Sequence, residues 1–396
     1  PIARNKRRIQ DIRITPDLDE AYKNGSLRVT LDLKGSGNVN LELLDATGKA
    51  VATETAKSSG TILMNVENPH KWTAETPYLY TLRATLQGSN EVIPVKVGFR
   101  KIELKGDQIL VNGQAVLFKG ADRHEIDPDG GYVVSPERMI QDIQVMKKFN
   151  INAVRTCHYP DQIPWYYMCD NAGIYVMAET NLESHGSFQK LGAIEPSCNV
   201  PGSLPQWKEA VLDRARNNFE TFKNHTSILF WSLGNESYAG DDIEAMNVYF
   251  SEKKDGRLVH YESAYYNRAY EDTISDLETR MYAKPEDVEE YLNNSPKKPY
   301  ILCEFMHDMG NSMGGLGAYM KLIDKYDMSH GGFIWAFIDQ AILVKDQVTG
   351  KEVLRYGGDF DDKPADYEFS ANGIVFADRK EKPAMQEVRY YYGLYR

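Results

Sequence analysis

Hydrophobic and polar residues alternate along the N-terminal quarter of the chain. From about Ser26 to Arg100, apolar side chains recur at every second position, and Gly, Asn, Asp and Pro separate the runs. The alternating runs are Leu27 to Leu33, Val39 to Leu43, Tyr78 to Ala84 and Ile93 to Val97. A period of two is typical of strands with one buried face. We expect residues 1–100 to form a small immunoglobulin-like β-sandwich that is preceded by an N-terminal linker.

After Gly106 the pattern changes to short apolar runs that alternate with helical segments. Ser135 and Pro136 are typical of a helix start, and apolar residues then recur at helical spacing as far as Phe149. Eight candidate strands follow this scheme: Val116 to Ala121, Asn152 to Arg155, Ile174 to Ala178, Ile228 to Leu233, Leu258 to Tyr261, Arg280 to Tyr282, Ile301 to Glu304 and Phe333 to Phe337. This alternation favours an α/β TIM (β/α)8 barrel over residues 101–396.

Residues that can take part in chemistry lie in or just beyond the carboxyl ends of these candidate strands. They are Arg123, His124, Glu125, His158, Glu179, Glu183, His185, Asn235, Glu236, Tyr282, Glu304, His307 and Trp335. A barrel brings the carboxyl ends of all its strands to one rim, and active sites of this fold lie on that rim. The sequence therefore predicts one pocket that is assembled from separate segments.

Glu236 and Glu304 each end a segment that reads as a buried strand. A buried carboxylate needs a partner or a proton, because isolation from water disfavours its charge. Two carboxyl groups across a sugar-sized cleft are what glycoside hydrolysis requires, one as an acid and one as a nucleophile or base. The alternative is a structural ion pair with an inward arginine, for which Arg123 and Arg155 are the candidates.

Glu183 and His185 stand two residues apart in a predicted extended loop, where both side chains can point the same way. Most such pairs are incidental. Together with Glu236 at the same rim, they would offer two carboxylates and an imidazole, a set that suits Mg²⁺ with its retained waters. Trp335 is the preferred aromatic platform for a sugar ring, although packing into the core is the usual role of such residues.

Cysteine content and charge narrow the class of protein. Cys157, Cys169, Cys198 and Cys303 lack zinc-type spacing, so we expect free thiols. Alternation along the strand predicts that the Cys303 thiol faces the helices, away from Glu304. A net charge of −11 argues against nucleic-acid or anionic-membrane partners. No apolar run approaches the roughly 18 residues of a membrane span, so we expect a soluble protein whose location, cytoplasmic or periplasmic, stays open.

The chain resembles glycoside hydrolase family 2, and within it the β-galactosidases. The resemblance covers nearly the whole chain, from Trp72-Thr-Ala-Glu-Thr-Pro-Tyr-Leu-Tyr-Thr-Leu82 and Gly98-Phe-Arg100 to Asn372-Gly-Ile-Val-Phe-Ala-Asp378. Further motifs are Arg123-His-Glu125, Cys157-His-Tyr-Pro160, Asn181-Leu-Glu-Ser-His-Gly186, Trp231-Ser-Leu-Gly-Asn-Glu236, Leu302-Cys-Glu304, His307, Met309-Gly-Asn-Ser312 and Tyr356-Gly-Gly-Asp-Phe360. An ordered set of this kind does not arise by chance.

The resemblance implies a role for each matching residue. Glu236 would be the acid/base, and Glu304 would be the nucleophile of a retaining mechanism. The substrate-binding residues would be His124, which stabilises the transition state, His158 and His307 at sugar hydroxyls, Asn235 at the 2-hydroxyl, Tyr282 on the nucleophile, Trp335 as platform, and Asn372. Glu183, His185 and Glu236 match the family's Mg²⁺ ligands, and the Phe369 carbonyl and Asn372 match part of its Na⁺ site.

The expected substrate is a β-galactoside oligosaccharide, and whether the protein forms a homo-oligomer stays open. Family members usually carry an N-terminal jelly-roll domain that contributes to the sugar and Na⁺ sites. We therefore expect this chain to be a fragment of a longer protein. Three alternatives remain: a β-glucuronidase, a β-mannosidase, and a non-catalytic fragment that binds carbohydrate.

Overall fold

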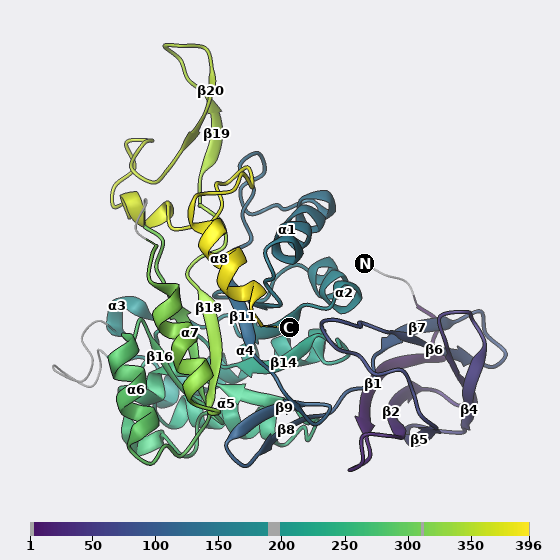
Figure 1. Cartoon of the computed structure of the whole chain (residues 1–396). Coiled ribbons are helices and arrows are strands. Elements are labelled where there is room, and N and C mark those ends of the chain that lie inside the picture. Colours follow the sequence, from purple (N-terminus) through teal and green to yellow (C-terminus); the bar gives the residue numbers. More distant parts are fainter. Residues whose placement is uncertain (1–3, 189–198, 310–312, 396) are drawn as a thin grey trace.

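The structure, a computed structural model, describes residues 4–188, 199–309 and 313–395 of the chain. Two bodies are visible: a β-sandwich at the N-terminal end and a larger barrel with helices around it (Figure 1). The fold follows the order of patterns in the sequence, with alternating strands first and strand–helix units afterwards.

The sandwich consists of two antiparallel sheets. One sheet has the order β1 (Arg8–Leu18), β2 (Gly25–Lys34), β5 (Gly60–Val66). The other has the order β4 (Ala50–Ala56), β3 (Val39–Leu44), β6 (Tyr80–Leu86), β7 (Val92–Val97). Alternate side chains such as Val29, Leu41 and Leu82 are completely buried in the shared core. The expectation of an immunoglobulin-like sandwich is confirmed.

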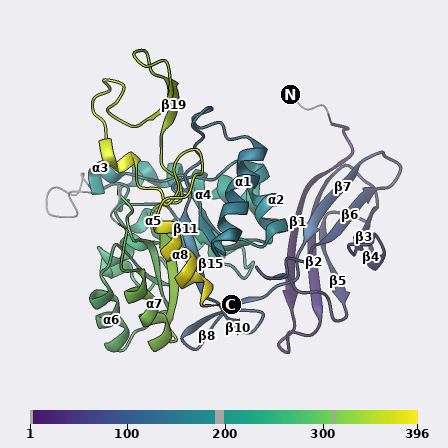
Figure 2. The ribbon, with the colours of Figure 1, turned by 45° about the horizontal axis from the view of Figure 1, so that its top comes forward.

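The prediction of an N-terminal linker is wrong for most of its length. Residues 8–18 form β1, which pairs with β2 over its whole length. β1 also lies against the barrel, since the Ile14 N–H donates to Asn224 Oδ1 at 2.9 Å (Figure 2). A register shift between Ile9 and Asp11 moves the buried positions by one residue. This bulge breaks the period of two, so the strand does not show in the sequence pattern.

The barrel is an eight-stranded sheet of parallel pairs, with the order β15-β14-β13-β12-β11-β18-β17-β16. Its strands are β11 (Phe118–Asp122), β12 (Ala153–Arg155), β13 (Tyr175–Glu179), β14 (Ile228–Ser232), β15 (Leu258–His260), β16 (Glu278–Met281), β17 (Tyr300–Phe305) and β18 (Ser329–Ile334). Every candidate strand of the second part of the chain is present. The expected (β/α)8 barrel is confirmed.

Helices cover the outside of the barrel. A small sheet lies across the end of the barrel that is at the bottom in Figure 1, which we call its lower end. The helices are α1 (Pro136–Lys148), α2 (Ile163–Ala172), α3 (His185–Phe188), α4 (Pro205–Phe222), α5 (Asp241–Ser251), α6 (Pro285–Asn293), α7 (Leu316–Lys325) and α8 (Ala384–Gly393). The small sheet comprises β8 (Ile102–Lys105), β9 (Gln108–Val111) and β10 (Gln114–Ala115). Among the described helices, none is long and apolar enough to cross a membrane.

The lower half of the barrel interior is apolar. Phe118, Phe230 and Ile301 meet there with Ile109 and Val111 of β9, and all are buried. The small sheet therefore closes this end of the barrel. At the opposite end, a hairpin of β19 (Ile342–Lys345) and β20 (Glu352–Arg355) projects away from the molecule (Figure 1).

Two motifs of the sandwich fix it to the barrel. The Arg100 guanidinium donates to the carbonyls of Thr226 at 2.6 Å and Ile228 at 2.9 Å, just before and within β14. The Trp72 indole N–H donates to the Asp170 carbonyl at 2.8 Å. These side chains are buried, so each satisfies backbone acceptors that would otherwise lack a partner.

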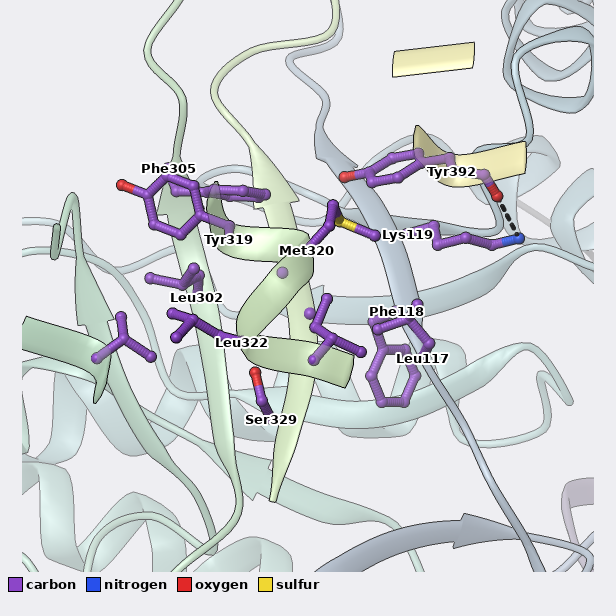
Figure 3. A pocket seen from close by; sticks show the side chains of 14 residues that line it. Leu117, Phe118, Lys119, Leu302, Phe305, Tyr319, Met320, Leu322, Ser329 and Tyr392 are labelled. Atoms are coloured by element: carbon purple, nitrogen blue, oxygen red, sulfur yellow. Dashed lines mark hydrogen bonds between the residues drawn. The ribbon is translucent and has the colours of Figure 1, made fainter. Parts of the chain in front are cut away.

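A small apolar cavity lies between the barrel wall and its helical layer (Figure 3). Leu302 and Phe305 of β17 enter it beside Met320 and Leu322 of α7. At its edge, Lys119 Nζ donates to the Tyr392 carbonyl at 3.2 Å. The cavity identifies the side chains of β17 that face outward, away from the barrel interior.

Candidate active site

The upper half of the barrel interior is polar and is centred on Arg155, the last residue of β12. Its guanidinium donates to Glu179 at 2.6 and 3.1 Å, to Asp122 at 3.0 Å, and to Glu304 Oε1 at 2.7 Å. It also donates to Asn235 Oδ1 at 2.9 Å. One buried cation thus ties together side chains from the carboxyl ends of several strands, as the sequence predicts for a barrel rim.

Glu304 is held at both carboxylate oxygens. Arg155 occupies Oε1, and the Tyr282 hydroxyl donates to Oε2 at 2.7 Å. Burial, reinforced by the neighbouring Glu304, raises the pKa of Tyr282, so the phenol keeps its proton and remains a donor. Glu304 is therefore an oriented carboxylate near the carboxyl end of β17, where one cation and one neutral donor bind it.

A β-bulge in β17 gives Glu304 this orientation. Between Leu302 and Phe305 the strand has one residue more than β18, and the register with β16 shifts at the same place. Leu302 and Phe305 both face outward, so the two residues between them lie on the inner side. The prediction that Cys303 faces the helices is wrong, because its thiol contacts Thr279, whose hydroxyl in turn contacts His260 Nε2 at 3.3 Å.

The expectation of free thiols is confirmed for Cys157, Cys169 and Cys303, which are all buried. Cys198 lies outside the described residues. So do the last three residues of the Met309-Gly-Asn-Ser312 motif.

Glu236 follows β14 and lies on the same rim. Its backbone is in the left-handed region, with φ of 36°, and its N–H donates to Glu262 Oε1 at 2.7 Å. Burial raises the pKa of Glu262 to about 8, so this carboxyl is neutral at pH 7 and accepts through its oxygen. Burial and the charge of Glu304 also raise the pKa of Glu236. Glu236 thereby favours the protonated form that a general acid requires.

His158, His124 and Trp335 form one aromatic wall. The His158 ring stacks on Trp335 with centroids 5.1 Å apart, and the His124 ring meets both edge-on. Burial lowers the pKa of each histidine to about 3, so both are neutral at pH 7. His158 Nδ1 lies 2.8 Å from Glu179 Oε1, and His124 Nδ1 lies 3.0 Å from the Tyr159 hydroxyl. Neutral rings can both donate to and accept from a hydroxyl-rich ligand.

The His307 ring contacts the rings of Tyr282 and Phe369, and Asn372 lies beside the segment that follows β18. The His307 ring is 5.6 Å from the rings of both Tyr282 and Phe369. Asn372 is buried and its carbonyl accepts the Ala336 N–H at 2.8 Å, while its side-chain Oδ1 has no hydrogen-bond partner. A buried amide oxygen without a donor is suited to a hard cation or a hydroxyl group.

Glu183, His185 and Glu236 form a metal-capable cluster. One ligand atom of each lies within 4.8 Å of the others, and His185 Nδ1 contacts Glu236 Oε2 directly. Asn235 connects this cluster to the interior network, because its Nδ2 donates to Glu183 Oε1 at 3.3 Å and its Oδ1 accepts from Arg155. Two carboxylates and one imidazole fit a hard divalent ion.

Not every residue of the predicted rim belongs to this site. The Arg123 guanidinium lies 4.0 Å from the Trp165 ring and donates to Asp142 at 3.0 Å and Asp161 at 2.8 Å, on the helix side of the strand. Glu125 also lies there, 3.6 Å from Arg123. Of the two arginines considered as structural partners, only Arg155 binds a member of the glutamate pair.

Sequence reasoning missed the supporting carboxyl groups Asp122 and Glu262 and gave no role to Glu179. Burial raises the pKa of Asp122 and of Glu179, and the charge of Arg155 opposes this shift in both groups. One signal was present: Asp122 and Glu179 are the last residues of β11 and β13. Glu262 gave no such signal, because it lies in the 3-10 turn η2 (Glu262–Tyr265).

A TIM barrel with two glutamates on its carboxyl rim, one held by an arginine and the other with a raised pKa, defines a class, that of the glycoside hydrolases. Two family models match the chain: "Glycosyl hydrolases family 2" over residues 7–100, and "Glycosyl hydrolases family 2, TIM barrel domain" over residues 102–396. The chain belongs to glycosyl hydrolase family 2.

Curated relatives are similar over nearly the whole chain. A "Beta-galactosidase large subunit" of Lactobacillus helveticus is 54% identical and covers 98% of the chain. A protein of the same name from Leuconostoc lactis is 52% identical over 98% of the chain. A "Beta-galactosidase" of Halalkalibacterium halodurans is 52% identical over 97%. The chain spans 63%, 63% and 39% of the lengths of these three proteins.

Solved structures share the fold. A β-glucuronidase from Ruminococcus gnavus in complex with uronic isofagomine superposes with a TM-score of 0.77 at 18% identity, covering 98% of this chain and 69% of that one. A Lactobacillus rhamnosus β-glucuronidase gives 0.74 at 22% identity, covering 98% and 68%. At this level of identity the likeness concerns the fold.

Proposed function

We propose that this chain is the sandwich and catalytic barrel of a retaining β-galactosidase, with Glu304 as nucleophile and Glu236 as acid/base. The observation that carries the proposal is the difference between the environments of the two glutamates. Glu304 is held by Arg155 and Tyr282, whereas burial and the charge of Glu304 raise the pKa of Glu236. Environments that separate the protonation states of two carboxyl groups assign the acid and the nucleophile.

In the first step, Glu304 attacks the anomeric carbon while Glu236 gives its proton to the departing glycosidic oxygen. The anomeric C–O bond breaks and an ester bond to Glu304 forms, so the aglycone leaves as a neutral alcohol. Tyr282 keeps Glu304 oriented during the attack, since it donates to one oxygen and leaves the carboxylate plane fixed.

In the second step, Glu236 acts as a base. Once Glu304 is esterified, its negative charge is gone, and one of the two causes that raise the pKa of Glu236 disappears. The lower pKa suits a group that must remove a proton from water as the water attacks the anomeric carbon. Ester cleavage returns Glu304 as a carboxylate to Arg155 and Tyr282, with retained configuration at the sugar.

The neutral wall of the site favours an uncharged sugar. A glucuronide would need a cation for its carboxylate, but Arg155 already binds protein carboxylates, and Arg123 lies on the helix side of its strand. His124, His158 and Trp335 offer neutral ring edges and faces instead. Together with the names of the curated relatives, this chemistry supports a β-galactoside as substrate.

Two cation sites accompany the proposal. Glu183, His185 and Glu236 would hold Mg²⁺, which supplies positive charge beside the acid/base when bound. Asn372 Oδ1, which lacks a hydrogen-bond partner, and the Phe369 carbonyl would contribute to a Na⁺ site. Dialysis against a chelator, followed by readdition of Mg²⁺, tests the first site: kcat should fall and then recover.

The names of the relatives support a further proposal, that the whole protein works with a second subunit. Native mass spectrometry of the protein from its own cells would show a complex with a different polypeptide. A single species of one chain, or a homo-oligomer, would contradict this part of the proposal.

The central test traps the intermediate. A 2-deoxy-2-fluoro β-galactoside with a good leaving group should label Glu304, and peptide mass spectrometry locates the label. A label on another residue would refute the assignment. Nitrophenyl β-galactoside should be hydrolysed much faster than the β-glucuronide or β-mannoside, and a crystal structure should show carboxyl groups about 5 to 5.5 Å apart. A spacing near 9 Å, typical of inversion, would contradict the retaining mechanism.

Glu304→Gln separates the enzyme from a fragment that only binds carbohydrate. The enzyme loses turnover in this variant but keeps galactoside affinity, measured by calorimetry. A fragment without turnover would show no difference between the two forms in either measurement.

A further inference from the structure

A second group of metal-ligand side chains lies on the same rim and differs chemically from the Glu183 cluster. His124, Cys157 and His158 each have a ligand atom within 4.8 Å of the other two. Cys157 is completely buried, against Trp335 and Ala336. No step of the proposed reaction uses its thiol, so its place between two histidines needs another account.

The two histidines are oriented as metal ligands usually are. His158 Nδ1 is engaged by Glu179 Oε1 at 2.8 Å, and His124 Nδ1 is engaged by the Tyr159 hydroxyl at 3.0 Å. In metal sites the second ring nitrogen of a histidine is typically held by a carboxylate or another polar group. In both rings Nε2 then remains for a ligand.

The donor set separates the two clusters by the kind of ion they prefer. Two imidazoles and a thiolate favour a thiophilic cation such as Zn²⁺, Cd²⁺ or Co²⁺, whereas two carboxylates and one imidazole favour Mg²⁺. Three protein ligands leave the fourth tetrahedral position open to the cleft. The ligand atoms need to approach one another by about 1 Å from their outer limit of 4.8 Å, because zinc–nitrogen and zinc–sulfur bonds are short.

We propose that His124, Cys157 and His158 form an inhibitory site for a thiophilic divalent cation, beside Trp335 in the aromatic wall. Binding replaces the Cys157 S–H bond by a metal–sulfur bond and releases the proton to solvent, while each neutral imidazole supplies a lone pair. The ion withdraws His124 and His158 from sugar hydroxyls and fills the space beside Trp335. Zn²⁺ therefore competes with substrate, an effect on activity that rests on the proposed function.

The first arm of the test reads metal binding without activity. The full-length protein, saturated with Mg²⁺, is titrated with Co²⁺ and followed by thiolate-to-cobalt charge-transfer absorption. The band should appear in the wild type and in Cys169→Ser, whose serine replaces another buried thiol, and should be absent in Cys157→Ser. A wild type without the band, or a Cys157→Ser variant that keeps it, overturns the proposal.

The second arm reads inhibition. Zn²⁺ should raise KM for nitrophenyl β-galactoside with kcat unchanged, and Cys157→Ser should weaken the inhibition by at least about 10- to 100-fold, the loss seen when even an outer partner of a ligand is removed. Without Zn²⁺, Cys157→Ser should keep wild-type kcat and the wild-type circular dichroism spectrum; if it does not fold, Cys157→Ala takes its place. If Zn²⁺ inhibits the Cys157 variant as strongly as it inhibits the wild type, the proposal is overturned. Absence of galactosidase activity with the cobalt band present refutes the proposed function alone.

Discussion

Two completely buried arginines lie at the carboxyl ends of neighbouring strands of the barrel, and each binds three carboxyl groups. Arg155 faces the interior and binds Asp122, Glu179 and Glu304. Arg123 faces the helices and binds Glu125, Asp142 and Asp161. We call these groups the inner and the outer arginine cluster. Their composition is nearly the same, yet only the inner cluster contains a residue of the proposed reaction.

The difference arises from the side of the strand on which each guanidinium lies. Asp122 and Arg155 are register partners on β11 and β12, and both face the interior. Arg123 follows Asp122 by one residue, so its side chain points the other way. The outer cluster lies against Asp142 of α1 and Trp165 of α2, whereas the inner cluster lies at the carboxyl ends of β11, β12, β13 and β17, on the rim. A buried ion network therefore indicates function only when a substrate can reach it.

The largest expected effect separates the clusters by an isosteric change in each. Glu304→Gln should lower kcat by at least about 10⁴-fold, because it removes the nucleophile. Asp161→Asn, the matched change in the outer cluster, should leave kcat of the folded protein near wild type and lower only the melting temperature. Steady-state rates with nitrophenyl β-galactoside and thermal unfolding check both. A comparable loss of kcat in Asp161→Asn would abolish the distinction.

The arginines themselves provide the next test. Arg155→Met and Arg123→Met should each destabilise the protein by about 3–5 kcal/mol, because buried carboxyl groups lose their cation, although Asp142 keeps its ion pair with Arg379. Only Arg155→Met should also reduce kcat of the molecules that remain folded, since Glu304 and Asn235 lose their orientation. Chemical denaturation gives the free energy of unfolding, and active-site titration with the 2-fluoro sugar counts the competent molecules. Equal kcat in the two variants would be the contrary result.

A smaller effect is expected when one tyrosine hydroxyl beside each cluster is removed. Tyr282→Phe deletes the hydroxyl that binds Glu304 Oε2, and kcat should fall by about 10²- to 10³-fold, as for other single donors to a reacting group. Tyr166→Phe deletes a hydroxyl that accepts the Asp161 N–H at 3.2 Å beside the outer cluster. That variant should keep its kcat. If Tyr282→Phe retained full activity, the hydroxyl would have no role in the reaction.

The smallest effect concerns the pH profile. The pKa of Glu236 is raised, and the residue must be protonated to act as acid, so kcat/KM should fall as pH rises through that raised pKa. The pKa values of His124 and His158 are about 3, so neither ring contributes a limb near neutral pH. The burst rate with a dinitrophenyl galactoside measures the first step, and the leaving group of this substrate needs no proton. In Glu236→Gln the alkaline limb should vanish from the pH profile of this burst rate. In Asp161→Asn it should persist.

Several elements could be predicted because their signal is local. The barrel strands are short and mostly buried, and α1 begins after its N-cap Ser135, whose hydroxyl accepts the Arg138 N–H at 3.2 Å. β1 and β4 were missed for opposite reasons. A bulge shifts the alternation in β1, whereas most side chains of the edge strand β4 are exposed and carry no hydrophobic pattern. The hydrophobic pattern indicates which residues are buried, and it does not by itself indicate which residues form strands.

The sequence by itself determined the barrel, the sandwich and the placement of Glu236 and Glu304 at the ends of strands, because buried strands and the polar residues that end them are contiguous in the chain. Only the tertiary structure decided that Arg155 and not Arg123 supports Glu304, that a bulge in β17 turns both Cys303 and Glu304 inward, and that Cys157 lies between two histidines. These facts depend on which face of a strand a side chain occupies and on pairings across more than a hundred residues. Such relations arise from packing, and local spacing does not encode them.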